Sequence, residues 1–146
     1  MIRTHDRAII LNDLANNYAL KMRYTKAIQR YREALSLYLT LAKKKPVDYG
    51  LHIAHIFSNL SIIYLNINKK KESETFYQNS LRMHRALVKN NLKKYGIGLA
   101  YCIMEGAFYL KQHSFTLYEA EAILNHFRGD GRADALLESI FELRKI

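Results

Sequence analysis

The chain has 146 residues, of which 49% are apolar and 25% are charged, proportions that are ordinary for a soluble globular protein of one domain. Its 23 Lys and Arg outnumber 13 Asp and Glu, and the resulting net charge of +10 permits acidic partners, nucleic acid or anionic membranes. A single cysteine, Cys102, excludes an internal disulfide framework, and no stretch approaches the ~18 apolar residues of a membrane-spanning helix. The opening residues lack the apolar run of a signal peptide, so we expect a protein of the reducing cytoplasm that is not membrane-bound.

Apolar residues recur at intervals of three and four along the whole chain, which is the period of an α-helix. No segment alternates with period two, and one proline and six glycines rarely interrupt the pattern. These features predict an all-α fold without a sheet. The expected helices are 5–21, 24–44, 49–67, 70–91, 97–111, 115–127 and 132–145.

Polar segments separate the expected helices, and short turns alternate with longer links. Lys21–Thr25 is a short turn whose threonine is placed to cap the following helix. Pro46 ends the second helix and opens a longer link, because proline cannot continue a helix. A second long link is expected around Tyr95–Gly98, and a further short turn at His113–Ser114.

The sequence repeats itself with a period of 46 residues, which separates Ala8 from Ala54, Ala54 from Ala100, and Tyr31 from Tyr77. A fixed period of this size indicates a stack of supersecondary units, each of which buries its apolar face against its neighbours. Such a stack presents an extended curved surface that suits binding better than catalysis. We expect one domain over 1–146, with repeats of about 4–46, 50–92 and 96–128 and a capping helix at 132–145.

Large apolar, small and aromatic residues occupy regular places in the first hairpin, at Leu11, Leu14, Ala15, Tyr18, Ala27, Tyr31 and Ala34. This pattern resembles the tetratricopeptide repeat, in which the small residues allow helices to cross closely. The second hairpin keeps the pattern with serine in place of alanine at Ser61, Ser73 and Ser80, whose hydroxyls we expect to bond a carbonyl one turn back. The third hairpin is degenerate and retains Gly106, Ala107, Tyr109 and Ala120.

The long period is similar to that of the long-repeat subfamily found in kinesin light chains and in many bacterial tetratricopeptide proteins. The segment 11–18 reads Leu-Asn-Asp-Leu-Ala-Asn-Asn-Tyr, close to a form common in that subfamily. The resemblance covers nearly the whole chain. It implies a right-handed α-solenoid of three hairpins plus a C-terminal capping helix, and a non-enzymatic protein–protein adaptor that binds a partner peptide or helix in its concave groove.

The resemblance also implies which side chains face the groove, because the first helix of each hairpin lines it in this family. Asparagine amides there can pair with both N–H and C=O of an extended peptide, and aromatic residues can anchor apolar side chains. These positions lack the two or three Lys or Arg that would grip a terminal carboxylate. The groove candidates are Asn12, Asp13, Asn16, His55, Asn59, Ile62, Tyr101, Glu105 and Phe108, with Met104 as a further apolar anchor.

A lysine-rich edge offers an alternative function, the binding of nucleic acid or an acidic partner. A simpler explanation is that lysine is favourable at the C-terminal end of a helix, where the second helices end. Tyr49 and Tyr95 lie nearby at matched positions of the repeat, and we expect them to pack inside the links and not to stack on bases. A third alternative is self-assembly through exposed repeat ends, with the chain as a piece of a longer array. The edge candidates are Lys43, Lys44, Lys45, Lys89, Lys93 and Lys94.

Catalytic and metal sites lack support in the sequence. His52 and His55 are spaced i, i+3 but have no further ligand at a suitable spacing. Cys102 has no adjacent histidine and lies on an apolar helix face, so we expect a buried structural thiol. The tripeptide at 128–130 is read as a helix stop in which Asp130 caps the last helix. We therefore expect no enzyme activity, no metal and no cofactor.

Overall fold

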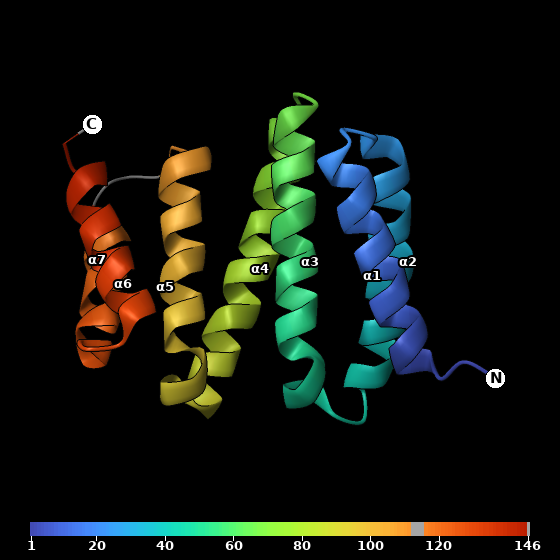
Figure 1. Cartoon of the computed structure of the whole chain (residues 1–146), viewed down its shortest axis with the longest axis horizontal. Helices are drawn as coiled ribbons and strands as arrows, with labels where there is room; N and C mark the ends of the chain where they lie inside the picture. The colour runs from blue at the N-terminus through green and yellow to red at the C-terminus, as the bar shows by residue number, and fades with distance from the viewer. Residues whose placement is uncertain (112–115, 146) are drawn as a thin grey trace. The chain divides into compact units, whose positions relative to one another are not determined.

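The computed structural model describes residues 1–111 and 116–145, and throughout that part its regular structure is helical, without a strand (Figure 1). The prediction of an all-α chain built from successive helical hairpins is confirmed. The expected turn at His113–Ser114 lies outside the described residues. The elements are α1 (Thr4–Leu20), α2 (Tyr24–Ala42), α3 (Pro46–Asn66), α4 (Lys70–Asn90), α5 (Leu92–Tyr109), α6 (Thr116–Leu124), a short 3-10 helix η1 (Asn125–Phe127) and α7 (Gly131–Leu143).

The chain divides into two compact units, Met1–Met83 and His84–Ile146, with the boundary inside α4. In the first unit, α1 packs on α2 and α2 packs on α3. In the second unit, α5 contacts α6 and α7, and α6 and α7 also contact each other (Figure 1). The single domain over 1–146 and its repeat boundaries stay predictions.

Both predicted long links are wrong, because α3 begins at Pro46 and α5 begins at Leu92. Proline is well suited to the first turn of a helix, where its missing N–H would have no partner. Asn91 caps α5, and its Oδ1 accepts a hydrogen bond of 3.0 Å from the Lys94 N–H. Gly96 is helical, and a Cβ there would lie 2.8 Å from the Phe127 ring, so this glycine permits close packing and does not break the helix.

The first helices of the first two hairpins end in the same backbone motif. Met22 and Asn68 adopt left-handed φ values of 58° and 62°. The N–H of the residue that follows then donates to a carbonyl of the preceding helix. Arg23 donates to the Tyr18 carbonyl at 2.9 Å, and Lys69 donates to the Tyr64 carbonyl at 2.8 Å. The two left-handed residues are 46 positions apart, so the sequence period is also a period of the backbone.

The two predicted caps have opposite outcomes. Thr25 does not cap α2, because the motif that ends α1 leads directly into a helix that begins at Tyr24, with Arg23 as its cap residue. Asp130 does cap α7, since its Oδ1 accepts a hydrogen bond of 2.8 Å from the Arg132 N–H.

Small side chains fill the helix crossings of the first unit. Ala15, Ala27 and Ala34 have no exposed surface, and the rings of Tyr31 and Tyr38 are almost fully buried beside them. Close packing of this kind leaves no room for an added methylene without strain. The small and aromatic residues that carry the resemblance in the first hairpin are thus residues of the core.

The serines of the second hairpin bond across the helix pair, so the predicted bond to a carbonyl of their own helix is wrong. The Ser61 Oγ donates to the Ser73 carbonyl at 2.8 Å, and the Ser73 Oγ donates to the Ser61 carbonyl at 2.7 Å. The Ser80 Oγ likewise donates to the Ala54 carbonyl at 2.9 Å. The crossing is so close that a facing carbonyl lies within reach of each hydroxyl.

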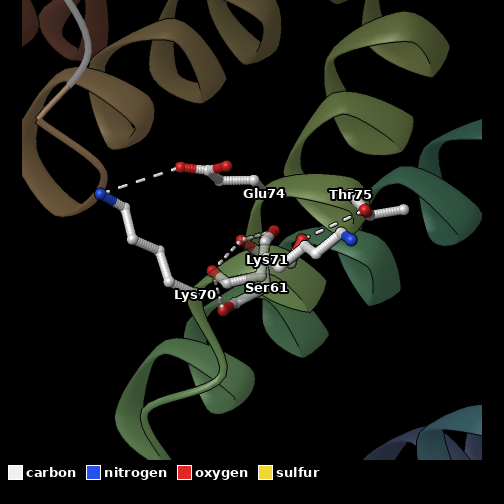
Figure 2. Close-up of polar contacts among 6 residues, drawn as sticks. Ser61, Lys70, Lys71, Glu74 and Thr75 are labelled. Atoms are coloured by element: carbon white, nitrogen blue, oxygen red, sulfur yellow. Dashed lines mark hydrogen bonds and ion pairs between the residues drawn. The ribbon is translucent and has the colours of Figure 1, made fainter.

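Figure 2 shows Ser61 inside this network, with solvent-exposed contacts of α4 nearby. Lys70 and Glu74 approach to 4.0 Å, and the Thr75 Oγ1 donates to the Lys71 carbonyl at 3.1 Å. Exposed pairs of this kind contribute little to stability. The buried serine hydrogen bonds and the close helix crossing therefore stabilise this hairpin more than the exposed contacts do.

Replacement of Ser61 tests whether the crossing demands a small side chain. Ser61→Ala is expected to change the free energy of unfolding by less than about 1 kcal/mol, because alanine fits the space and the Ser73 hydroxyl keeps its own bond. Ser61→Leu is expected to lower it by about 2 kcal/mol or more through overpacking. Urea unfolding measures both, with Ser36→Leu on the exposed face of α2 as the control. Equal tolerance of leucine at both positions would contradict the packing argument.

Candidate binding grooves

The first unit contains a cavity of about 340 Å³ between α1, α2 and α3, which we call the amide groove. Three of the predicted groove residues, Asn16, Asn59 and Ile62, come together there. The lining has no charged side chain, so it is polar only through amides and phenols. The other lining residues are Ala19, Leu20, Tyr24, Tyr31, Ile63 and Asn66.

The hydroxyl of Tyr31 organises the amide groove. It donates to the Asn16 Oδ1, and burial raises the pKa of Tyr31 to about 12, an effect that a hydrogen bond with Asn59 partly offsets. The carbonyl oxygen of Asn16 is therefore engaged, and its NH₂ group carries the remaining donors. Tyr31 was not among the predicted groove residues, although its place in the repeat made it a core aromatic.

Three predicted groove residues, Asn12, Asp13 and His55, do not line this cavity. The Oδ1 of Asn12 is buried and accepts no hydrogen bond within the described residues. Burial raises the pKa of the Tyr38 phenol, and the nearby charge of Asp13 raises it further. Burial and the neighbouring His52 lower the pKa of His55. Their role in a groove stays a prediction.

The second unit contains a larger cavity of about 750 Å³ between α5 and the C-terminal part of the chain at α7, which we call the acidic groove. The predicted residues Tyr101, Glu105 and Phe108 line it together with Met104. Tyr101 and Phe108 are 53% and 51% exposed, so their rings are available to a partner. The remaining lining residues are Tyr109, Ala135, Leu136, Glu138, Ser139, Glu142, Leu143 and Lys145.

Glu105 is the electrostatically unusual group of the acidic groove. Burial raises its pKa from 4.5 to about 7, and no ion pair within the described residues involves it. It stands about one turn before the end of α5, where the helix dipole also disfavours a negative charge. The charge of Glu105 in turn is the largest cause that raises the pKa of Tyr101. Near neutral pH this carboxyl is therefore only partly ionised.

The wall that α7 contributes was missed by the sequence reasoning, which treated the last helix only as a cap. Glu138 and Glu142 are four residues apart and so lie on one helix face. That spacing of acidic residues was the available signal. Phe141 is 61% exposed, and the Lys145 ammonium lies 4.4 Å from the centre of its ring.

The predicted basic edge consists of exposed lysines. Each unit carries three of the candidates, and none of the six forms an ion pair in the part of the chain that the structure describes. Tyr38 and Tyr95 are only 1% and 5% exposed, so they cannot stack on nucleic-acid bases. Tyr49 packs against His5, with ring centres 5.4 Å apart. The candidates are Lys43, Lys44 and Lys45 in the first unit and Lys89, Lys93 and Lys94 in the second.

The described residues give little support to a metal site, a reactive thiol or a membrane-spanning helix. Within residues 1–111 and 116–145 no three His, Cys, Asp or Glu side chains gather to hold a metal ion. Cys102 is 1% exposed, as predicted for a structural thiol. None of the described helices combines the length and apolarity that a membrane crossing requires.

Comparison with known proteins adds one match. Residues 53–91, which cover most of α3 and α4, match the family model described as tetratricopeptide repeat. No curated protein matches the chain in a sequence search. The matched segment contains the serine crossing and the groove residues Asn59 and Ile62.

Glu105→Gln tests the electrostatics of the acidic groove. Because folding raises the pKa of Glu105, the folded chain binds the proton more tightly, and stability falls as pH rises from about 4.5 to about 7. The variant removes this cost. It is expected to equal the wild type near pH 4 and to exceed its free energy of unfolding by about 1–3 kcal/mol near pH 8. Urea unfolding at both pH values measures this, with exposed Glu72→Gln as the control; the same difference at both pH values would count against the assignment.

Proposed function

We propose that this chain, in which residues 53–91 match the tetratricopeptide repeat, is a non-enzymatic adaptor that holds segments of a partner protein in the separate grooves of its two units. Repeats of this family generally mediate protein–protein interaction. One observation carries the proposal: six predicted groove residues gather at two cavities, three at the amide groove and three at the acidic groove.

The amide groove suits the backbone of an extended segment. Tyr31 fixes the Asn16 amide through a hydrogen bond and also bonds Asn59, so donors are held in place before a partner arrives. A site that is already ordered leaves most of the ordering cost with the ligand. Ile62 supplies an apolar contact beside the amides.

A second candidate function is self-association, which exposed apolar side chains of α1 favour. Ile9 and Ile10 are 38% and 54% exposed, and both lie outside the amide groove. Association of copies through this helix would give a mass that rises with protein concentration, whereas a constant monomer mass in light scattering over a wide concentration range would exclude it.

The proposed compartment is the cytoplasm. Its reducing conditions suit a chain whose one thiol, that of Cys102, is buried and takes part in no disulfide. Redox sensing by this thiol would require exposure that it lacks.

A pull-down from the source lysate tests the adaptor function. The Asn16→Ala/Asn59→Ala double variant is expected to lose at least about tenfold of the partner that the wild type retains, because both bound amides are removed. Nuclease and moderate salt are present throughout, since nucleic-acid binding would collapse under them. Quantitative mass spectrometry measures the retained protein.

The matched control for the pull-down is Leu39→Ala, which removes an exposed apolar side chain of α2 that lines neither cavity. Circular dichroism confirms that each variant remains helical. Equal retention of the partner by wild type, control and double variant would remove the binding site from the amide groove.

A further inference from the structure

The acidic groove is a local exception in a chain of net charge +10. Three carboxyl groups line it, those of Glu105, Glu138 and Glu142, against the single ammonium group of Lys145. That ammonium already bonds the Glu142 carboxylate at 3.2 Å. The groove therefore offers negative charge that the described protein does not neutralise.

A neighbouring cation that would be able to neutralise the groove is held elsewhere. The Arg144 guanidinium pairs with Glu121 and lies 4.3 Å from the centre of the Tyr118 ring. Neither of these two partners lines the acidic groove. The contacts of Arg144 thus leave Glu105 and Glu138 to an outside cation.

Apolar side chains line the groove together with these carboxyl groups. Tyr101 and Phe108 are about half exposed, and Met104, which is only 6% exposed, lines the groove on the same helix α5. Aromatic faces attract cations and also bury aliphatic side chains. A largely buried carboxyl such as that of Glu105 among apolar side chains discriminates by charge, because an acidic occupant would be repelled and a purely polar one would be poorly solvated there.

We propose that the acidic groove binds a partner segment in which a lysine or arginine lies among apolar side chains, with the cation paired to Glu105 and the apolar neighbours packed on Phe108 and Met104. This inference deepens the proposed adaptor function and rests on it. Charge complementarity selects this occupant over nucleic acid, whose phosphates the groove repels.

Glu105 gives this pairing its selectivity. Folding has already removed the carboxyl from most of its water, and burial raises its pKa to about 7. A cation from the partner restores a charge-assisted hydrogen bond, which is among the stronger polar contacts in proteins. A neutral side chain in the same place leaves the carboxyl without that compensation.

Selection of peptides from a random library displayed on phage tests the inference with the full chain. Peptides of about 16 residues span about four helical turns, comparable to α7. Enriched sequences are expected to carry Lys or Arg next to aromatic or aliphatic residues more often than the starting library. The best binder is then synthesised and its affinity measured by fluorescence anisotropy.

Variants locate the bound peptide and its cation. Glu105→Gln and Phe108→Ala are each expected to weaken binding by about tenfold or more, while Glu72→Gln and Leu39→Ala, outside the groove, change it less than about twofold. Replacement of the basic residue of the peptide by norleucine should weaken its binding to the wild type by a similar factor. The same replacement should not weaken its binding to Glu105→Gln any further. Such coupling identifies the pair.

The outcomes separate this inference from the function on which it rests. Peptides that require Phe108 but lack basic residues, or that ignore Glu105→Gln, would overturn the cationic occupant and leave the adaptor function standing. Failure to enrich any peptide, or binders indifferent to both groove variants and to Asn16→Ala/Asn59→Ala, would overturn both. A dimer in sedimentation that Phe108→Ala dissociates would assign the groove to a second copy and overturn the inference.

Discussion

Helices of the first unit can approach closely only because small side chains occupy their crossings. The side chains of Ala15, Ala27 and Ala34 are fully buried, and serines occupy the equivalent places in the second hairpin. Because the helices touch there, hydroxyls reach carbonyls of the facing helix and tyrosine rings fill the space on either side. Both the register of the hairpins and the direction of their outward side chains follow from this contact.

The grooves depend on the same packing. Tyr31 is a core aromatic by its place in the repeat, yet its hydroxyl extends to the amide groove and bonds Asn16. One side chain thus joins the stability of the first unit to the geometry of its candidate site. In the second unit the pattern is degenerate, and the acidic groove instead uses exposed rings of α5, a buried carboxyl and a wall from α7. The two grooves therefore differ in lining, and we propose a neutral ligand segment for the first and a cationic one for the second.

Periodicity predicted what depends on one helix face at a time, namely the helices. The resemblance supplied the groove candidates, of which Asn16, Asn59 and Ile62 line one cavity and Tyr101, Glu105 and Phe108 line the other. Their role in binding stays a prediction. Periodicity failed where a contact between helices decides. Gly96 was taken for a break because the Phe127 ring that it accommodates is distant in sequence. The serines bond a facing helix that local spacing cannot place, and α7 lines a groove although alone it is an amphipathic cap. The starts of α2 and α4 were predicted correctly, but Thr25 was mistaken for a cap because the backbone motif that ends α1 leads directly into a helix that begins at Tyr24.

We propose that a bound partner segment lies in these grooves, and methyl NMR of the labelled protein can locate it. The methyl groups of Ile62 and Met104 report on the amide groove and the acidic groove, and Leu39 lies outside both. On titration with a peptide that binds the protein, we expect the Ile62 or Met104 resonances to shift while those of Leu39 stay in place. Shifts at Leu39 with Ile62 and Met104 unchanged would contradict it.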